Sequence, residues 1–230
     1  MIGLGRVAYA TAFVVQCEHH ARVVAAREAG SPVVGVVLLV EHDPPVITVS
    51  RRPEARGHLL ASAEALRRDG IEVCETDRGG DITYHGPGQL VAYPIFDLNT
   101  LGMNLHAYMR FLEQAVIDTC AAFGVATMRD PSATGVWTID PSGQPAAKIA
   151  ALGVRVRRWV TMHGLALNVT TNLAHFDHIV PCGLAGREVT SLRRELGDKC
   201  PSIEGVKMGL TARLRSSAAE SAARSAVRPR

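Results

Sequence analysis

Apolar residues recur along the chain with two different periods, and their alternation predicts both helices and strands. Helical spacing predicts a first helix that ends at Gly30 and Pro32. Its apolar face comprises Phe13, Val14, Cys17, Ala21 and Val24. Residues 33–40 form a continuous apolar run rich in β-branched residues, which predicts a strand buried on both faces. Further strands are predicted at 46–49, 71–74, 90–96, 125–128 and 136–139, and two strands that could pair at 147–156 and 159–169.

Capping residues mark the other helices. Ser62 caps a short helix that ends at Gly70, and Asn104 caps a longer helix that ends at Gly124. Two C-terminal helices are predicted near 189–196 and 203–214.

Helices and strands are intermixed without a strict βαβ alternation. The predicted fold class is therefore α+β, a single domain with a mixed β-sheet flanked by helices. This domain is expected to span residues 1–215, since no internal repeat or linker interrupts it. The Ala/Ser/Arg stretch 216–230 is expected to be a disordered tail.

Composition narrows the class of protein. Hydrophobic residues make up 47% of the 230, enough for a sizeable core. The formal net charge is only +3, and part of it lies after Ser216, so binding to nucleic acid through many phosphate contacts is not expected. No segment has the roughly 18 consecutive apolar residues of a membrane span, so no membrane partner is expected.

The five cysteines are too scattered for a disulfide framework. No CxxC and no Cys/His spacing suits a structural zinc, so no metal is expected. The apolar run 7–15, followed by Cys17, faintly resembles an export signal, but Gln16 stands where a small residue would precede cleavage. The run is therefore read as part of the mature protein, with a reducing, cytoplasmic location.

Cys182 is the cysteine best placed for chemistry. It lies in a predicted loop between Pro181 and Gly183, and a glycine lets the backbone approach a ligand and offer its N–H to an oxyanion. The remaining cysteines are read as inert, because they fall in predicted helices or strands or have no evident partner: Cys17, Cys74, Cys120 and Cys200.

A nucleophilic thiol needs an activating group, because few thiols are ionised at neutral pH. Histidines are the common activators, and those available are His85, His163, His175 and His178. Lys148 is the alternative, since lysine is rare in this chain and this one lies in the apolar stretch 146–150. An exposed strand lysine is the ordinary reading, whereas burial would suit the amine to proton transfer.

Residues 78–89 form a segment in which five of the twelve residues are Gly or Pro. Such a segment is read either as turns or as bare backbone against which a substrate lies. Its glycines lack the spacing of a Walker A loop and of a Rossmann fingerprint, which weakens an ATP-dependent reading. His85 and His163 are each followed by glycine and are read either as cleft residues or as structural hydrogen-bonding histidines.

Four segments together resemble the signatures of the lipoyl(octanoyl) transferases, in the expected order. They are Arg78-Gly79-Gly80-Asp81-Ile82-Thr83-Tyr84-His85-Gly86-Pro87-Gly88-Gln89-Leu90-Val91, Lys148-Ile149-Ala150-Ala151-Leu152-Gly153-Val154-Arg155-Val156, His163-Gly164-Leu165-Ala166-Leu167-Asn168-Val169 and Pro181-Cys182-Gly183-Leu184. The resemblance spans about 37–192. One departure is local: the stretch 41–48 carries an extra residue, and Ser50 precedes Arg51 where the family usually has glycine.

The resemblance implies a fold similar to the biotin/lipoate protein ligase catalytic domain. It implies an acyltransferase that takes octanoate from octanoyl-acyl carrier protein and holds it as a thioester on Cys182, with Lys148 as acid–base partner. The acceptors it implies are lysines on lipoyl domains of 2-oxo acid dehydrogenase E2 subunits and on the glycine-cleavage H protein. Neither ATP nor a metal cofactor is implied.

The same resemblance implies which residues line the acyl site, with His163 and Gly183 in possible support. The implied substrate-binding residues are Arg78, Gly79, Gly80, Asp81, Ile82, Thr83, Tyr84, His85, Ala151, Leu152, Gly153, Gly164, Leu165 and Ala166. Both protein partners are expected to be acidic. Two basic clusters are candidates for docking them, or are ordinary solvated faces: Arg155, Arg157 and Arg158, and Arg187, Arg193 and Arg194.

Three rival functions remain open. An ATP-dependent lipoate or biotin ligase would make an acyl-adenylate and need no cysteine. A catalytically dead relative would bind the carrier protein only, but both Cys182 and Lys148 are present. A thioesterase would use water in place of the acceptor amine.

Overall fold

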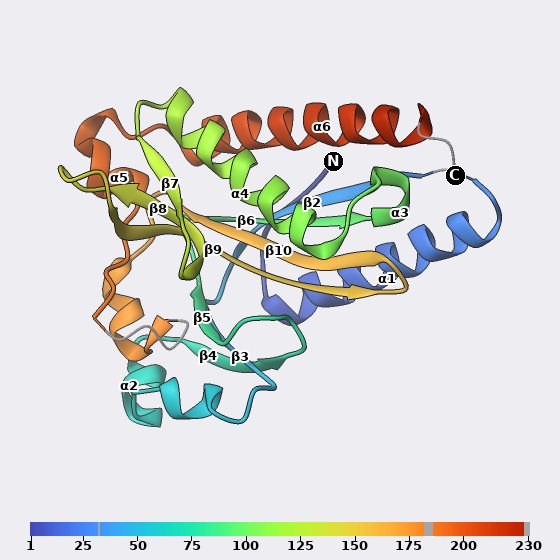
Figure 1. The fold of residues 1–230 in the computed structure, drawn as a ribbon. Coiled ribbons are helices and arrows are strands. Elements are labelled where there is room, and N and C mark those ends of the chain that lie inside the picture. Colours follow the sequence, from blue (N-terminus) through green and yellow to red (C-terminus); the bar gives the residue numbers. More distant parts are fainter. Residues whose placement is uncertain (32, 182–185, 228–230) are drawn as a thin grey trace.

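A seven-stranded sheet forms the centre of the molecule in the computed structural model, which describes residues 1–31, 33–181 and 186–227 (Figure 1). The strand order is β1-β2-β6-β10-β9-β8-β7. These strands are β1 (Ile2–Val7), β2 (Gly35–His42), β6 (Gln89–Phe96), β7 (Thr127–Asp130), β8 (Ala133–Ile139), β9 (Pro145–Arg157) and β10 (Val160–Asn168). Only β1 and β2 pair in parallel within this sheet, so the sheet is mixed, as predicted.

A smaller sheet of three strands lies below the large sheet in Figure 1. Its central strand is β3 (Val46–Ser50), which pairs in parallel with β4 (Glu72–Thr76) and antiparallel with β5 (Ile82–His85). The α-helix α2 (Ala63–Arg68) and the short 3₁₀ helices η1 (Ala55–His58) and η2 (Leu173–His178) accompany this sheet.

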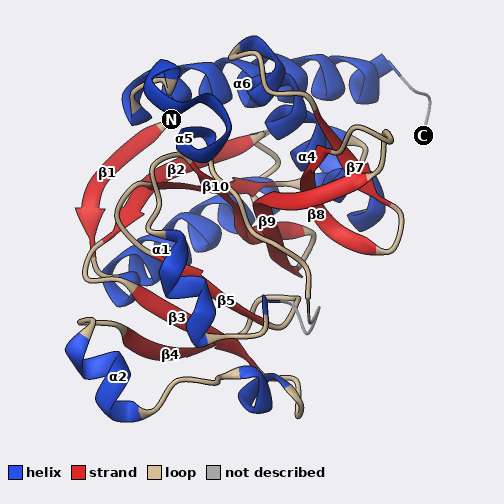
Figure 2. Ribbon diagram, turned by 90° about the vertical axis from the view of Figure 1, so that its left-hand side faces the viewer, coloured by secondary structure: helices blue, strands red, loops and turns tan. Residues whose placement is uncertain are grey.

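Helices cover both faces of the large sheet (Figures 1 and 2). The helices α4 (Leu105–Ala122) and α6 (Ile203–Val227) lie on one face, with α3 (Leu98–Leu101) against α6. The helix α1 (Tyr9–Glu28) packs on the other face, the face that also looks toward the small sheet. The helix α5 (Leu192–Leu196) and the 3₁₀ helix η4 (Gly197–Lys199) connect β10 and η2 to α6.

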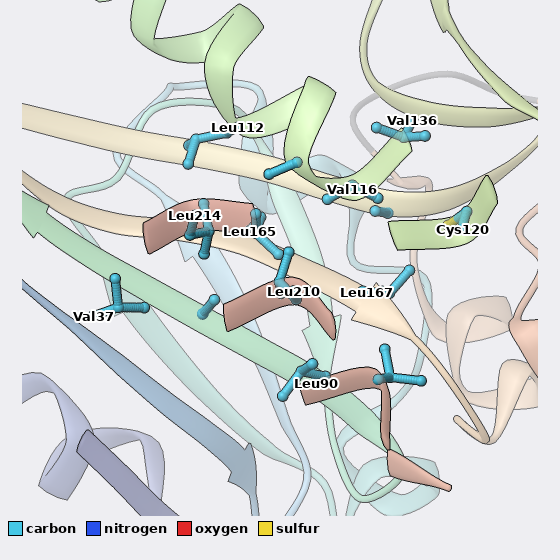
Figure 3. Close-up of a cluster of buried hydrophobic side chains, with 14 of the residues drawn as sticks. Val37, Leu90, Leu112, Val116, Cys120, Val136, Leu165, Leu167, Leu210 and Leu214 are labelled. Carbon is cyan, nitrogen blue, oxygen red and sulfur yellow. The ribbon is translucent and has the colours of Figure 1, made fainter. Parts of the chain in front are cut away.

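Three hydrophobic clusters hold these layers together. The largest fills the space between α4, α6 and the sheet, where Leu112, Leu165 and Leu210 meet (Figure 3). A second cluster lies between α1 and the opposite face of the same sheet. A third lies around the small sheet and is separate from both. The region between the second and third clusters is where the candidate site lies.

Several sequence predictions are confirmed. Ser62 and Asn104 accept hydrogen bonds from the third residue of their helices, Ala65 N–H at 3.2 Å and Ala107 N–H at 2.8 Å. The two strands predicted to pair do so, as the antiparallel hairpin β9–β10. The α+β fold class is likewise confirmed.

The predicted face of the first helix is only partly right: Val24 is buried, but other members of that face are not. Val14 is 56% exposed and Cys17 is exposed, whereas Gln16 is completely buried. The buried face of α1 includes the polar residue Gln16, so the spacing of apolar residues alone did not identify this face correctly. Strand β1 and the strand β5 inside the glycine-rich segment were not predicted either.

The expectation of a disordered tail differs from the structure. Helix α6 continues past Ser216 to Val227, so within the stretch 216–230 the structure describes a helix up to Val227. Leu214, Ala218 and Ser221 are buried at spacings of four and three, so the Ala/Ser composition concealed a helical packing stripe.

Candidate functional site

The inter-sheet pocket lies between the large sheet and the small sheet, and its floor is built from small residues. On the hairpin β9–β10, Ala151 faces Ala166 and Gly153 faces Gly164 across the strands. All four line the pocket. The two alanines present only methyl groups to the pocket. The two glycines allow close backbone contacts: a Cβ on Gly153 would lie 2.7 Å from the carbonyl oxygen of Gly79, and one on Gly164 would lie 2.2 Å from that of Ala92.

The other walls come from elements far apart in the sequence. Tyr9 of α1, Tyr93 of β6 and Ile82 of β5 contribute, together with the segment that precedes β5. Most of the predicted substrate-binding residues line this pocket: Arg78, Gly80, Asp81, Ile82, Thr83, His85, Ala151, Leu152, Gly153, Gly164, Leu165 and Ala166. His163 lines it too.

Two predicted residues support the pocket without lining it. The N–H of Gly79 donates to the carbonyl of Val154 at 2.9 Å, which ties the glycine-rich segment to β9. The hydroxyl of Tyr84 hydrogen-bonds to Nδ1 of His175 at 2.9 Å, and its ring is buried in the core of the small sheet.

Lys148 lies in a second, narrow pocket that adjoins the first. The two pockets share Thr83, Ala151 and Ala166 in their walls, so they are direct neighbours. Lys148 is only 5% exposed, and Pro181 lines the same narrow pocket.

Trp137 provides an aromatic surface for Lys148. The Nζ atom of Lys148 lies 4.7 Å from the centre of a Trp137 ring, and the guanidinium of Arg187 lies 4.1 Å from a ring centre of the same residue. Both cations interact with the negative face of the π-system. Arg187 also forms an ion pair with the buried Asp130. The lysine is therefore a buried, oriented amine and not an exposed strand residue.

The backbone of Lys148 holds the segment that follows Cys182 in the chain. Its N–H donates to the carbonyl of Glu188 at 2.8 Å, and the N–H of Thr190 donates to the carbonyl of Lys148 at 2.9 Å. Cys182 and Gly183 lie outside the described residues. The described residues on either side of them, Pro181 and Gly186, both line a groove that contains Arg187 and Arg194.

A chain of side-chain hydrogen bonds joins residues that line the two pockets: His85 of the first, and Gln89 and Asn168 of the second. Gln89 donates to Oδ1 of Asn168 at 2.9 Å, and Asn168 donates to the carbonyl of Thr190 at 2.9 Å. Because the amide group of Gln89 donates, its Oε1 accepts, at 2.7 Å, from Nδ1 of His85. His85 therefore carries its proton on Nδ1 and keeps the lone pair on Nε2. Burial, and then the neighbouring His42, lower the pKa of His85 well below its ordinary value, so the ring is neutral.

A buried aromatic cluster lies behind His85. Nδ1 of His42 donates to the carbonyl of Val7 at 3.2 Å, so its Nε2 accepts the hydroxyl of Tyr93 at 2.7 Å. Burial lowers the pKa of His42 to about 4. The ring of Tyr9 stacks at 6.4 Å on that of His85. This wall of the pocket is polar in composition but uncharged.

His163 closes the pocket near the end of the hairpin. It has a left-handed backbone with a φ of 58°, which is unusual for a residue other than glycine. Its Nε2 lies 2.9 Å from Asp77, which also pairs with Arg155. Burial lowers the pKa of His163, and Asp77 offsets part of that effect. Burial alone would raise the pKa of Asp77, but His163 and Arg155 hold it below its ordinary value.

Sequence reasoning missed several residues of this site. Their shared signal is a polar or aromatic side chain inside or next to an apolar run, where burial forces it to find a partner. These residues are Tyr9, Gln16, His42, Asp77, Tyr93 and Trp137. Which of them lie together depends on strand order, which the sequence alone did not provide.

Within residues 1–31, 33–181 and 186–227, no three His, Cys, Asp or Glu side chains are grouped so that they could hold a metal ion. None of the helices that the structure describes combines the length and apolar character that crossing a bilayer requires.

The fold is similar to that of lipoate and biotin protein ligases of known structure. Lipoate-protein ligase A bound with ATP superposes with a TM-score of 0.61, at 17% identity over 79% of this chain and 71% of its own. The bipartite lipoate protein ligase of Thermoplasma acidophilum superposes with a TM-score of 0.64, at 16% identity over 94% of this chain and 84% of its own. A biotin protein ligase from Aquifex aeolicus superposes with a TM-score of 0.54, at 12% identity over 95% of this chain and 70% of its own. At these identities the likeness concerns the fold, which confirms the predicted architecture.

The sequence comparisons define the family. Residues 15–215 match the model of the lipoyl protein ligase A/B catalytic domain, and the chain belongs to this family. An octanoyltransferase of Acidobacterium capsulatum is 47% identical over 86% of this chain and 81% of its own length. An octanoyltransferase of Koribacter versatilis is 46% identical over 92% of this chain and 80% of its own length. The resemblance to the octanoyltransferases that the sequence motifs indicated is thereby confirmed.

Proposed function

We propose that this protein transfers an octanoyl group from octanoyl-acyl carrier protein to a lysine of lipoyl domains, without ATP or a metal. The reaction type and the acyl group come from relatives named octanoyltransferase that are 46–47% identical over most of the chain. The lipoyl-domain acceptors follow from the family, the lipoyl protein ligase A/B catalytic domains.

The observation that supports this proposal best is that the inter-sheet pocket adjoins the narrow pocket lined by Lys148. The floor of Ala151, Gly153, Gly164 and Ala166 suits a flexible apolar chain. The narrow pocket beyond it contains one buried amine, that of Lys148. An acyl chain in the first pocket would present its carbonyl carbon in the second.

The proposed first half-reaction acylates Cys182. Lys148 takes the thiol proton, and the thiolate attacks the carbonyl carbon of the donor thioester. Backbone N–H groups near Cys182 and Gly183 stabilise the tetrahedral oxyanion. Collapse of this intermediate breaks the bond between the carbonyl carbon and the carrier sulfur. Lys148 then gives the proton that it took from Cys182 to the carrier sulfur, which leaves as a thiol. Thioester exchange is nearly neutral in free energy, so binding sets its direction.

The proposed second half-reaction delivers the chain to the acceptor. The acceptor lysine amine attacks the Cys182 thioester, an amide bond forms, and the Cys182 sulfur leaves. Lys148 accepts the proton of the attacking amine and returns it to the thiolate. Amide formation from a thioester is downhill, which is why this route uses no ATP. Two substrates that react in turn with one thiol predict ping-pong kinetics.

The decisive experiment is intact-protein mass spectrometry after mixing with octanoyl-acyl carrier protein and no ATP. The wild type is expected to gain one octanoyl adduct that hydroxylamine removes and that added apo lipoyl domain discharges. Cys182→Ser is expected to gain no such thioester, whereas Cys17→Ser, a control at an exposed cysteine of α1, is expected to behave as wild type. Lys148→Met is expected to acylate at least 100-fold more slowly, the usual size of a lost acid–base contribution.

Three other results would replace this proposal. Turnover that needs free octanoate and ATP would make the protein a ligase. Discharge of the adduct to water, even with apo lipoyl domain present, would make it a thioesterase. Binding of the carrier protein with neither adduct nor transfer would make it a non-catalytic relative.

A further inference from the structure

The inter-sheet pocket ends next to a second hollow on the surface, the arginine cleft. This cleft is lined by Ser50, Arg51, Arg52, Pro53, Asp77, Arg78, Gly79, Gly80, Val154 and Arg155. Of the residues that the structure describes, only Arg78 and Gly80 line both the pocket and the cleft. The boundary between an apolar pocket and a basic surface therefore depends on one long side chain.

Arg78 spans the gap between the two sheets. Its guanidinium donates to the backbone carbonyl of Thr48 at 2.9 Å and to the hydroxyl of Thr48 at 3.0 and 3.3 Å, so its tip is anchored on β3. Its stem crosses to β9, where Cδ would lie 3.2 Å from a Cβ built on Gly153. The same Cβ would lie 2.7 Å from the carbonyl oxygen of Gly79. Only a glycine on β9 allows the segment and the strand to approach this closely.

This boundary lies at the end of the pocket that is remote from Lys148. Along β9 the chain passes from Lys148 in the narrow pocket, through Ala151 and Gly153 in the inter-sheet pocket, to Arg155 in the cleft. Lys148 and Gly153 are five positions apart, roughly 16 Å at about 3.3 Å per strand residue. An acyl chain whose carbonyl lies near Lys148 would therefore point its methyl end toward Arg78.

We propose that Arg78, anchored on Thr48, is the end wall that sets the longest acyl chain the pocket accepts. This inference rests on the proposed function, since it assumes that the pocket holds an acyl chain. Up to the wall, each methylene that the pocket buries strengthens binding about fourfold. A longer chain would have to displace a hydrogen-bonded guanidinium or fold back on itself. Removing the side chain would connect the pocket to the arginine cleft and let the methyl end pass through.

The wall predicts a change in chain-length profile and not a general loss of activity. Free fatty acids from six to fourteen carbons are titrated into the full-length protein by calorimetry, and the matching acyl-carrier proteins are compared as donors. Wild type is expected to bind more tightly with each added methylene and then to weaken sharply at one length. Arg78→Ala is expected to remove that break and to bind twelve- and fourteen-carbon acids at least tenfold more tightly than wild type.

Two further variants make the test specific. Arg51→Ala removes one positive charge from the same cleft without touching the inter-sheet pocket, and is expected to keep the wild-type break. Arg78→Met keeps a stem of similar length but loses the bonds to Thr48, and is expected to shift the break to longer chains. It also provides the measurement if Arg78→Ala does not fold.

The outcomes separate this inference from the proposed function. The inference would be rejected if binding weakened at the same chain length in Arg78→Ala and Arg78→Met as in wild type. It would also be rejected if Arg51→Ala shifted that length as much as the Arg78 variants do. Absence of a break in wild type would overturn it as well. Fatty-acid profiles that shift as expected, together with no transfer from any carrier protein, would support the wall and reject the octanoyltransferase reaction.

Discussion

At the scale of single residues, the site depends on how closely its neighbours pack around Lys148. Gly135 of β8 has a φ of +138°, and a Cβ there would lie 3.1 Å from Cε of Lys148 and 2.9 Å from the carbonyl oxygen of Ala150. The lysine stem thus occupies the space that a side chain at 135 would need. The sequence did not predict this role of Gly135, because its contact with Lys148 joins two different strands.

Gly135→Ala is expected to displace the Lys148 amine and to lower kcat for octanoyl transfer by at least tenfold. Gly143→Ala is the matched control, because Gly143 also has a positive φ of 81° but nothing within 4 Å of an added Cβ. Both variants place an alanine at a positive φ, and Gly135→Ala adds the contacts with Cε of Lys148 and with the carbonyl oxygen of Ala150. Equal kcat values for the two, at equal melting temperatures, would show that Gly135 does not position the lysine.

Buried neutral histidines make the stability of the fold depend on pH. The pKa of His42 is lowered from 6.5 to about 4. Between pH 6.5 and pH 4, this histidine is therefore protonated in the unfolded chain and neutral in the folded protein. The stabilising effect is complete above pH 6.5 and is lost as the pH falls toward 4.

Urea unfolding at pH 7 and pH 5 measures this effect. Between pH 7 and pH 5, the free energy of unfolding of the wild type is expected to fall by about 2 kcal/mol more than that of His42→Gln. His106→Gln, a control at an exposed histidine of α4, is expected to lose as much as wild type. Parallel losses in wild type and His42→Gln would mean that His42 is not kept neutral by burial.

At the scale of elements, strong periodicity and caps were predictable and irregular packing was not. The hairpin β9–β10 and the capped helix α4 were found from sequence, because their signals are local. The strand β5 was missed, because glycine and proline dominate its segment and its pairing with β3 is a long-range contact. Most of the residues that line the inter-sheet pocket were named from the resemblance of whole motifs, whereas their joint position depends on how β5, β9 and β10 meet.

The C-terminal part of α6 provides a prediction at this scale. Ala218 and Ser221 are buried, and a Cβ on Gly102 would lie 2.8 Å from Oγ of Ser225, so the end of α6 packs on the end of α3. Truncation after Arg215 is expected to lower the melting temperature by several degrees. Truncation after Val227 is the control and is expected to change nothing. Equal melting temperatures of the two truncated proteins would indicate that residues 216–227 do not stabilise the fold by packing.

At the scale of the whole molecule, the two basic clusters lie at different ends of the fold. Figure 1 shows the β9–β10 turn, which bears Arg157 and Arg158, on the right, and α5, which bears Arg193 and Arg194, on the left. Arg194 lines the surface groove that also contains Pro181, next to the pocket of Lys148. Of the two clusters, the one around α5 therefore lies closer to the proposed chemistry.

A charge reversal in each cluster tests which one receives an acidic carrier protein. Arg194→Glu is expected to raise KM for the carrier about 3- to 10-fold at low ionic strength, with little change at high salt, because screening removes the effect. Arg157→Glu makes the same charge change at the other cluster and is expected to leave KM unchanged. The reverse ranking would move the docking surface to the hairpin turn.

The floor of alanine and glycine has a consequence for the energy of the whole catalytic cycle. In the free protein, a pocket lies between the two sheets, so side chains do not fill this part of the molecule completely. During the proposed cycle the octanoyl chain would provide that missing apolar volume, at about 0.8 kcal/mol for each buried methylene. The loaded enzyme would then be the better-packed state of the fold. Every delivery would return the protein to its less stable form, ready to take up the next chain.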